Sequence, residues 1–499
     1  MDPSDARNPS PNAMSAWRRF CHGPWPIVLL IAAATLLRLR DTLHNRSLWL
    51  DEASLACNFL DRSLAQLLEP LAFNQAAPPA FLLGTKWVVD SFGIHEWTLR
   101  LIPLGAGLLI APLFYVLASR YLGRAGTLFS LALVASSSAL IFYSNEFKPY
   151  GCDALVSIAI ILSLQRLVET GANTWRGLLI PALLAIISPW LSFPSVFVFA
   201  ATLTAGGFRA IAAKNSQGFF VLAVIAATAA GSCALCYLSF ARRNYAIPGM
   251  VDYWLAHGAF MPVPPRSAAD LTWYTSQVFG FFEDVGGLHS SRNLMLALAV
   301  IGMLRFVRQR LWWITASCAG PLLLAALASG LHAYPFQGRL LLFSVPGAVL
   351  LCGAGIDAIH EATRTHRYVL GVLVAVALFS PVAYTVRTAI RGTEVEEVRP
   401  LLEQITRTTK PDVPVVVLGA ETPYRYYAAK LPLPVAVFLP HDDTLASRLQ
   451  RLPARAAWLL MSHLDDATER AARAAVADAG WKTIREHRRT GAFLLELSR

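Results

Sequence analysis

The chain of 499 residues is too apolar for one soluble domain, since 55% of its residues are hydrophobic, only 15% are charged and the mean hydropathy is +0.47. Apolar runs of about 18 or more residues, each long enough to cross roughly 30 Å of hydrocarbon as a helix, recur from residue 25 to residue 384. The composition excludes a water-soluble enzyme and predicts an all-α polytopic membrane protein.

The net charge of +11 does not indicate nucleic acid as a partner. Basic residues cluster in short connections between the apolar runs, as at Arg120 and Arg124 or at Arg308 and Arg310, and do not form one stripe. Lys and Arg are enriched in this way in the cytoplasmic loops of membrane proteins. We therefore expect membrane lipids around the chain and a cytoplasmic N-terminus.

The predicted membrane domain covers residues 21–390. Residues 1–20, rich in Pro, Ser and Asn, are expected to form a disordered cytoplasmic tail. The apolar run 25–37 resembles a signal peptide, but the charged stretch after it offers no small-residue cleavage site, so we interpret it as a retained anchor. Further spans are expected at 99–119, 126–143, 151–168, 176–190, 193–211, 219–240, 292–307, 311–331, 340–357 and 368–386, which makes about eleven in all.

Three polar connections face outward in this topology, at 38–97, 144–150 and 242–291, and chemistry is expected there. Within the first, the stretch 80–90 is apolar but too short to span the bilayer. We expect it to lie in the interface as an amphipathic helix, with Lys86 extended towards the lipid phosphates.

The odd number of spans places the last part of the chain, 391–499, on the outer side. Its pattern predicts a small extracytoplasmic α/β domain of about 110 residues. Helices are expected at 395–406 and 467–479, and strands at 413–418, 457–461 and 492–497.

The acidic pair Asp51 and Glu52 follows the first span at the expected depth of the headgroups. A carboxylate that is partly desolvated there is a plausible general base, because its pKa can rise. The alternative is structural: both acids would also suit the N-terminus of a helix that starts at this point.

Two outer corners offer further charged groups. The turn 143–150 contains Glu146 and Lys148 between tyrosines, and the corner 332–339 ends with Arg339, where topology does not call for a positive charge. A guanidinium at this depth can bind a phosphate with two parallel hydrogen bonds. The alternatives are an aromatic belt with a local ion pair for the first corner, and binding of any anionic lipid headgroup for the second.

Two other acids have simpler explanations. Glu96 and Arg100 are four residues apart and would form a pair on one helix face. Asp153 stands just inside a span, where a carboxylate needs a partner, and Lys148 is close enough in sequence to supply it.

Taken together, these motifs resemble the bacterial membrane glycosyltransferases related to protein O-mannosyltransferases and to the aminoarabinose transferase of lipid A, within the glycosyltransferase C superfamily. The resemblance spans about residues 40–390. It rests on the order and spacing of Leu-Asp-Glu-Ala at 50–53, Asn-Gln-Ala-Ala-Pro-Pro at 74–79, Glu96 with Leu-Arg-Leu at 99–101, Tyr-Ser-Asn-Glu-Phe-Lys at 143–148, and Tyr-Pro-Phe at 334–336 with Arg339.

The resemblance implies a multi-pass enzyme of the bacterial inner membrane, with its C-terminal domain in the periplasm, that takes a sugar from a polyprenyl-phosphate carrier at the outer face. The family's acid in the first outer loop matches Asp51, with Glu52 beside it, and its second acid matches Glu146. Many relatives carry Gln-Glu-Ala-Arg where this chain has Asn-Glu-Phe-Lys at 145–148, so its basic partner is Lys148.

From these motifs we assign roles for sugar transfer. A sugar on a lipid phosphate already has a good leaving group, so the enzyme needs one base for the acceptor hydroxyl and cations for the departing phosphate. Asp51 is the expected base and Glu52 its helper, with Glu146 as a third acid at the site. The expected phosphate-binding residues are Lys148, Arg339, Lys86 and Arg100, and the expected substrate-binding residues are Asn74, Gln75, Tyr150 and Tyr334.

Several alternatives stay open at this stage. A lipid or sugar transporter would place ionisable residues near mid-membrane, and a non-catalytic scaffold would account for the outer domain but not for the acids. The sugar is open, as is an acceptor that is a glycan, a lipid or a protein. Asp51 and Glu52 could hold a divalent cation, although they supply too few ligands alone.

Overall fold

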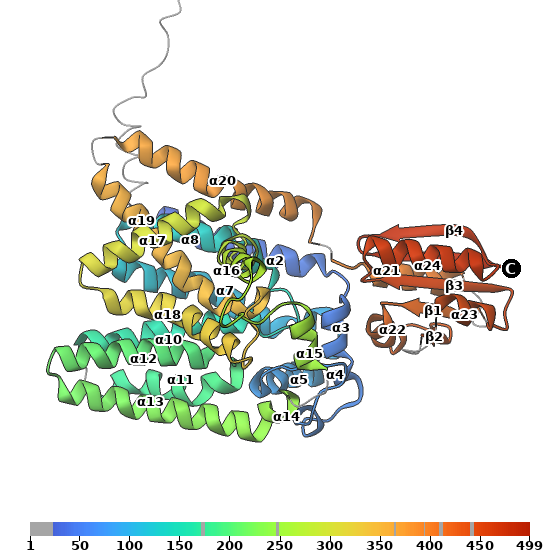
Figure 1. Cartoon of the computed structure of the whole chain (residues 1–499), viewed down its shortest axis with the longest axis horizontal. Coiled ribbons are helices and arrows are strands. Elements are labelled where there is room, and N and C mark those ends of the chain that lie inside the picture. Colours follow the sequence, from blue (N-terminus) through green and yellow to red (C-terminus); the bar gives the residue numbers. More distant parts are fainter. Residues whose placement is uncertain are drawn as a thin grey trace, which may run out of the picture.

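The computed structural model describes residues 23–170, 175–245, 249–363, 366–393, 395–408, 413–439 and 444–499, so the predicted tail at 1–20 lies outside the described residues. A long helical body is joined at one end to a small domain that contains a sheet (Figure 1). The predicted fold class, a polytopic helical membrane domain followed by a small α/β domain, is confirmed.

The helical body holds, within the described ranges, eight segments long and apolar enough to cross a membrane. They are α7 (Leu101–Tyr121), α10 (Tyr150–Thr170), α12 (Ser195–Ala212), α13 (Ser216–Cys236), α17 (Arg292–Arg308), α18 (Trp312–Gly330), α19 (Val345–Ala362) and α20 (Arg367–Arg391). Two shorter apolar helices, α8 (Arg124–Ser136) and α11 (Trp175–Leu191), and the first helix α2 (Trp25–His44) bring the set close to the predicted eleven.

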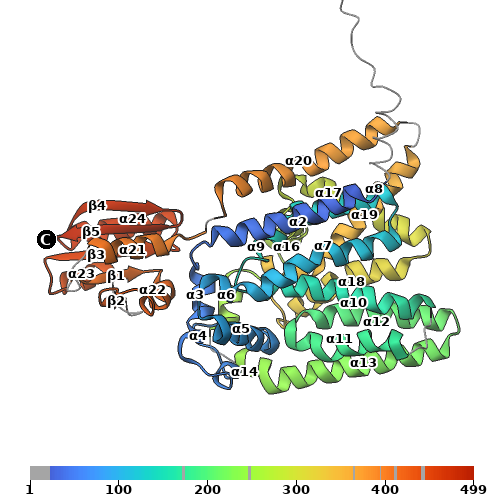
Figure 2. The same cartoon turned by 180° about the vertical axis from the view of Figure 1, so that it is seen from behind.

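Helix α2 is longer than the predicted span 25–37 and takes up the first residues of the predicted outer loop 38–97. It runs along the back of the body beside α7 and α8 (Figure 2). The buried Arg38 sustains this extension, because its guanidinium donates to Ser144 Oγ (3.2 Å) and to the carbonyl of Ala34 (2.9 Å).

Two predicted spans are interrupted close to the outer end. The span 126–143 is broken after Ser136, and the hydroxyl of Ser137 caps the short helix α9 (Ser138–Phe142) by accepting from Leu140 N. The span 340–357 begins as the 3₁₀ segment η5 (Gly338–Ser344) before α19. Serine side chains compete for backbone hydrogen bonds and so favour such breaks.

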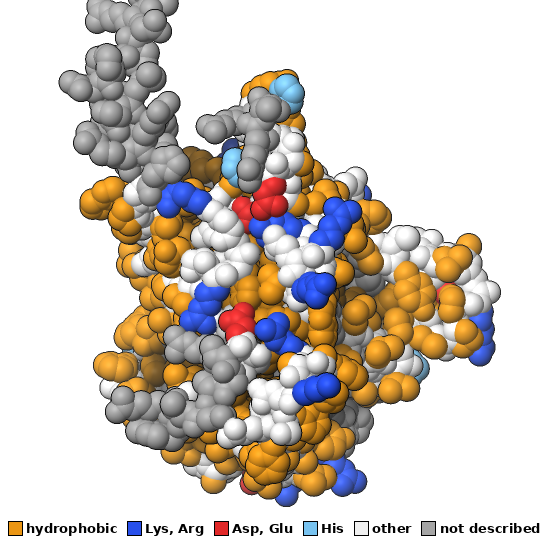
Figure 3. Space-filling model, turned by 90° about the vertical axis from the view of Figure 1, so that its left-hand side faces the viewer, with side chains coloured by type: hydrophobic (Ala, Val, Ile, Leu, Met, Phe, Trp, Pro, Cys, Tyr) orange, Lys and Arg blue, Asp and Glu red, His pale blue; other side chains and the backbone are white. Residues whose placement is uncertain are grey.

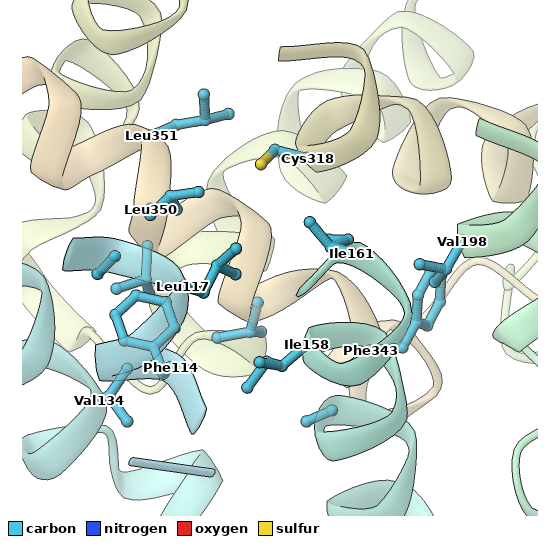
Figure 4. Close-up of a cluster of buried hydrophobic side chains, with 14 of the residues drawn as sticks. Phe114, Leu117, Val134, Ile158, Ile161, Val198, Cys318, Phe343, Leu350 and Leu351 are labelled. Atoms are coloured by element: carbon cyan, nitrogen blue, oxygen red, sulfur yellow. The ribbon is translucent and has the colours of Figure 1, made fainter. Parts of the chain in front are cut away.

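The helices bury a continuous apolar core. Figure 4 shows Phe114 and Leu117 of α7 facing Ile158 of α10 and Leu350 of α19. The closest crossing joins α17 to α19, where a Cβ on Gly302 would lie 1.9 Å from the carbonyl oxygen of Leu351. Only a residue without a side chain allows the two backbones to approach this closely.

The outer connections are largely helical. The first contains α3 (Leu50–Ala56), α4 (Asn58–Asp61), η1 (Gln66–Leu68), α5 (Pro79–Phe92) and α6 (Glu96–Leu99). The third contains α14 (Arg242–Tyr245), α15 (Met250–Ala256), α16 (Ala268–Gly280), η3 (Phe281–Val285) and η4 (His289–Ser291), with η2 (Tyr237–Ala241) leading into it. Of these elements, α3, α4, α5, α14 and α15 lie towards the C-terminal domain, whereas α16 lies nearer the middle of the helical body (Figures 1 and 2).

The opposite end of the body carries the basic connections. Figure 3 views this end and shows many Lys and Arg side chains gathered on it. The α12–α13 connection supplies Arg209 and Lys214, and the α17–α18 connection supplies Arg308 and Arg310. This separation of charge agrees with the expected cytoplasmic position of these turns.

The C-terminal domain is a five-stranded mixed sheet in the order β2-β1-β3-β5-β4. β1 (Val415–Leu418) pairs in parallel with β2 (Ala436–Phe438) and β3 (Ala456–Ser462), and β5 (Ala492–Ser498) is antiparallel to β3 and β4 (Lys482–Arg489). The helices are α21 (Val398–Thr408), α22 (Glu421–Ala428), α23 (Leu445–Gln450) and α24 (Asp466–Asp478).

The sequence analysis missed two strands and two helices of this domain, β2, β4, α22 and α23. β4 reads Lys-Thr-Ile-Arg-Glu-His-Arg-Arg and is almost entirely exposed, as is typical of a charged edge strand that does not attract further pairing. Such a strand has no apolar alternation, so only its pairing with β5 identifies it.

The crossing of α17 and α19 yields a prediction. Gly302→Ala should lower the free energy of unfolding by about 1–3 kcal/mol, because the new methyl group must push the two helices apart. Thermal unfolding of the purified protein in detergent measures this effect. Gly231→Ala in α13, where a Cβ meets nothing within 4 Å, is the matched control; equal unfolding temperatures for the two variants would contradict the close crossing.

Candidate active site

A cavity of about 590 Å³ lies where the outer ends of the helices meet the C-terminal domain. Its walls come from α3, the loop before α5, the starts of α10 and α12, α15, η5 and the loop after β3. The residues that line it include Trp49, Asp51, Ser54, Phe73, Asn74, Gln75, Lys148, Tyr150, Asp153, Phe193, Tyr253, Trp254, Tyr334, Arg339 and His463.

Asp51 is the carboxylate at the centre of the charged wall. Lys148 Nζ donates to Asp51 Oδ1 (2.9 Å), and Arg339 Nη2 lies 2.5 Å from Oδ2. Gln75 bridges this group, because its amide nitrogen lies 3.4 Å from Asp51 Oδ1 and its amide oxygen accepts from Lys148. Burial raises the pKa of Asp51, but the charges of Lys148 and Arg339 outweigh burial and hold it below its ordinary value.

Glu52 faces away from the cavity and is fully buried. It accepts from Arg100 Nε (2.8 Å), Arg100 Nη2 (2.6 Å) and the amide of Phe147 (2.7 Å), and Arg46 lies 3.7 Å away. Burial raises the pKa of Glu52, and the two arginines more than reverse that effect. Glu52 therefore ties α3 to the turn 144–149 and to Arg100.

The helix-start interpretation of the acidic pair holds in the structure, and it does not conflict with the position of Asp51 in the cavity wall. Asp51 and Glu52 do occupy the first turn of α3, where the helix dipole favours them. Successive residues of a helix point about 100° apart, so one carboxylate reaches the cavity while the other enters the protein. The helix start and the ion pairs coexist, because the helix aims each side chain at its cations.

Glu146 lies behind the cavity wall and does not line it. Its Oε1 accepts from Trp49 Nε1 (3.2 Å). Burial raises the pKa of Glu146 to about 7; the charge of Arg339 opposes this shift, and Glu52 and Asp51 add to it. A neutral carboxyl can be buried at lower cost than a charged one, and here it orients the indole that forms part of the cavity.

Arg339 stands at the start of η5 with its guanidinium between two aromatic rings. Its Cζ lies 5.6 Å from the ring centre of Trp49 and 5.7 Å from that of Tyr150. Such rings attract a cation through their faces. Tyr334 shapes the same wall, because its hydroxyl donates to the carbonyl of Leu340 (2.7 Å).

Seven residues of the sequence prediction meet in the cavity: Asp51, Asn74, Gln75, Lys148, Tyr150, Tyr334 and Arg339. Four others lie outside it. Arg100 is committed to Glu52 and to the carbonyls of Arg46 and Ser47, and Lys86 pairs with Asp90 (2.8 Å) on α5. Glu52 and Glu146 are the other two.

Two expected pairs form differently. Glu96 contacts Arg399 (2.9 Å) and the hydroxyl of Tyr427 (3.1 Å) of the C-terminal region, in place of Arg100. Lys148 contacts Asp51 and Gln75 in place of Asp153, which lines the cavity itself. Partners that are distant in sequence displaced the near ones because the fold brings them to the same corner.

A divalent cation does not fit the acidic pair. Across the residues that the structure describes, no group of three or more His, Cys, Asp or Glu side chains is placed to hold a metal ion. Asp51 and Glu52 point in different directions, and each is already neutralised by two cationic side chains.

Sequence reasoning missed Trp49, Phe73, Tyr253, Trp254 and His463. Trp49 directly precedes the acidic pair, and the adjacent aromatics Tyr253 and Trp254 lie in an outer loop already expected to carry chemistry, so composition offered a signal for these three. His463 has no such signal, because more than 400 residues separate it from Asp51 along the chain.

The comparisons with known proteins bear on the fold. No protein-family model and no curated protein sequence matches the chain. The apo crystal structure of ArnT from Cupriavidus metallidurans aligns over 97% of this chain and 98% of its own, with a TM-score of 0.56 and 13% identity. The chain has the glycosyltransferase C fold. That fold was expected from the motifs and is confirmed.

Two further structures share this fold. ArnT from the same organism bound to undecaprenyl phosphate aligns over 94% of this chain and 97% of its own, with a TM-score of 0.52 and 15% identity. The oligosaccharyltransferase of Archaeoglobus fulgidus in complex with Zn and sulfate aligns over 93% and 72%, with a TM-score of 0.56 and 12% identity.

The network around Glu52 yields a prediction for stability. Glu52→Gln should lower the free energy of unfolding by about 3–5 kcal/mol, because it leaves the buried Arg46 and Arg100 without a counter-charge. Thermal unfolding in detergent measures this. Glu69→Gln, at an exposed position of the same outer segment, is the control; a Glu52→Gln variant as stable as this control would show that Glu52 is not structural.

Proposed function

We propose that this protein is a glycosyltransferase that moves a sugar from a polyprenyl-phosphate donor to an acceptor hydroxyl at the outer face of the bacterial inner membrane. The observation that carries the proposal is the contact of Asp51 with both Lys148 and Arg339 in a cavity at the outer end of the helices. A carboxylate and two cations in one cavity are what this reaction requires.

The fold supports the choice of donor. The structure of ArnT bound to undecaprenyl phosphate shares the fold of this chain over nearly its full length. A polyprenyl phosphate presents one anionic group at headgroup depth, and Lys148 and Arg339 are the Lys and Arg side chains that line the cavity among the described residues. The chemistry of the cavity and the ligand of the fold neighbour thus agree.

The ion pairs suggest how the base is activated. Before the donor binds, the carboxylate of Asp51 occupies the place between Lys148 and Arg339 that we propose for the donor phosphate. The donor phosphate can take over both cations, since phosphate and carboxylate present similar oxygens to a guanidinium. Asp51 then loses the charges that depress its pKa and becomes more basic.

The transfer step follows from this exchange. The acceptor oxygen attacks the anomeric carbon of the sugar while its proton passes to Asp51. The bond between that carbon and the phosphate oxygen breaks, and the electron pair leaves with the polyprenyl phosphate. Lys148 and Arg339 stabilise the charge that develops on the departing phosphate. No further reactant is needed for the atoms to balance.

The remaining walls suit a sugar. Phe73, Tyr253, Trp254 and Tyr334 offer aromatic and apolar surface, while Asn74 and Gln75 supply amides for hydroxyl groups. Asn74 reaches the cavity through a left-handed backbone (φ 51°), a conformation that asparagine tolerates better than most residues. These residues are the proposed substrate contacts.

The rival hypothesis of a transporter finds less support. It requires ionisable residues along a path across the bilayer, and Asp153, expected just inside a span, is the residue that comes nearest to this requirement. Asp153 lies in the first turn of α10 and lines the same cavity as Asp51, close to the outer end. A transport path needs such groups near the bilayer midplane.

The proposed base gives the first test. Asp51→Asn should lower sugar transfer from a labelled polyprenyl-phosphate donor by about 100-fold or more, with membrane insertion and unfolding temperature retained. Asp61→Asn, exposed in the same outer segment, is the control and should transfer at the wild-type rate. Near-normal turnover in Asp51→Asn would remove Asp51 from the mechanism.

The proposed phosphate contact gives the second test. Arg339→Ala should raise the apparent KM for the lipid donor roughly tenfold or more, because a charged hydrogen bond to the phosphate is lost. Steady-state kinetics with the donor varied at a saturating acceptor concentration measures it. Arg292→Ala serves as the control, because Arg292 stands at the start of α17 and pairs with Glu283 away from the cavity. An effect confined to the acceptor KM would contradict the assignment.

A further inference from the structure

The C-terminal domain forms hydrogen bonds with the extended segment that leads into Asp51. Three backbone amides of this segment donate to side chains of the C-terminal region. The contacts are Ser47 N to Glu397 Oε1 (3.1 Å), Leu48 N to the hydroxyl of Tyr427 (3.0 Å) and Leu50 N to Glu396 Oε2 (3.0 Å). All three acceptor residues are buried. The domain therefore sets the position of the helix that carries Asp51.

The same domain places one side chain in the cavity wall. His463 directly follows β3 in a left-handed backbone (φ 55°), and its Nδ1 lies 2.7 Å from Glu396 Oε1. Glu396 thus uses one oxygen for the imidazole and the other for Leu50 N. This carboxylate fixes His463 and the approach to Asp51 together.

The support behind Glu396 is rigid. The turn between β4 and β5 packs against it so tightly that a Cβ on Gly491 would lie 2.3 Å from the carbonyl oxygen of Val395. Ser462, at the end of β3, donates to the carbonyl of Gly491 (3.0 Å). Glu396 and His463 are therefore held by the same end of the sheet, which keeps Glu396 in place as the partner of the imidazole.

His463 and the guanidinium of Arg339 both lie near the indole of Trp49 in the cavity wall. The ring centres of His463 and Trp49 are 6.4 Å apart, and Arg339 Cζ lies 5.6 Å from the centre of that same indole. The imidazole side chain is about half exposed (52%), so it is accessible to a ligand. With Nδ1 engaged by Glu396, Nε2 is the ring atom left for such a ligand.

We propose that His463 is a third phosphate-binding residue, whose imidazolium Nε2–H donates to the phosphate of the lipid donor beside Arg339 and Lys148. This inference rests on the proposed function, because it takes the donor phosphate to bind in this cavity. It gives the C-terminal domain a direct part in the active site.

The electrostatic surroundings favour the charged imidazole. The hydrogen bond to Glu396 raises the pKa of His463, burial lowers it, the charges of Glu396 and Asp51 raise it and Arg339 lowers it; the net result lies above the ordinary value. The imidazolium exists below that pKa. Donor binding should therefore weaken as pH rises through it.

Binding of undecaprenyl phosphate to the full-length protein in detergent, measured from about pH 6 to 9, tests the proposal. His463→Gln should bind roughly tenfold more weakly than wild type at the acid end and lose this pH dependence. His463→Lys should retain tight binding at pH values where wild type weakens. Glu396→Gln should shift the pH dependence to lower pH, because it removes the charge that favours the imidazolium.

His487→Gln is the matched control, since His487 lies on β4 of the same domain, contacts Gln404 and does not line the cavity. It should bind like wild type. If wild type binds undecaprenyl phosphate and His463→Gln binds it equally well, this inference fails and the proposed function stands. Failure of wild type itself to bind the lipid would overturn the proposed function and this inference with it. His463 would instead be assigned as a base if His463→Gln bound the lipid as wild type does while the kcat of wild type fell towards acid pH. That outcome would overturn its phosphate role.

Discussion

The site depends on the ion pairs and hydrogen bonds of one buried carboxylate, that of Glu52. It satisfies Arg100 at the start of α7, neutralises Arg46 and accepts from the amide of Phe147 in the turn between α9 and α10. Three segments far apart in sequence thus meet on one side chain. Removing this charge would leave its cationic partners buried without a counter-charge. The same network positions Asp51, the residue before Glu52, and Lys148, the residue after Phe147.

Adjacent carboxylates have divided roles because a helix turns. Glu52 points into the protein and is fully buried, whereas the side chain of Asp51 is 17% exposed and faces the cavity. Both have lowered pKa values for the same reason, two cations each. The difference is that the cations of Asp51 also line the cavity and are free to exchange partners with a ligand. Asp51 is therefore the member of the pair that a ligand in the cavity can reach, and for this reason we propose it as the base.

The site also depends on both domains. Glu396, Glu397 and Tyr427 hold the segment before α3, and Arg399 reaches back to Glu96. Most of these contacts are buried and involve charged groups, which makes them costly to break singly. The C-terminal domain therefore helps to hold the segment that carries Asp51, and it supplies His463 to the wall of the same cavity.

The sequence by itself determined the membrane class, about eleven helices and the outer placement of the charged motifs, because hydropathy and spacing are local properties. It also placed Asp51, Lys148 and Arg339 in one site through the order of the motifs, and the strands with apolar alternation in the C-terminal domain. Only the tertiary structure decided that Arg100 serves Glu52, that Lys86 serves Asp90, that β4 is a strand and that His463 reaches the cavity. Each of these depends on pairing with another strand, on a partner tens to hundreds of residues away, or on the direction in which a helix points a side chain. None of the three is a property of the local sequence pattern.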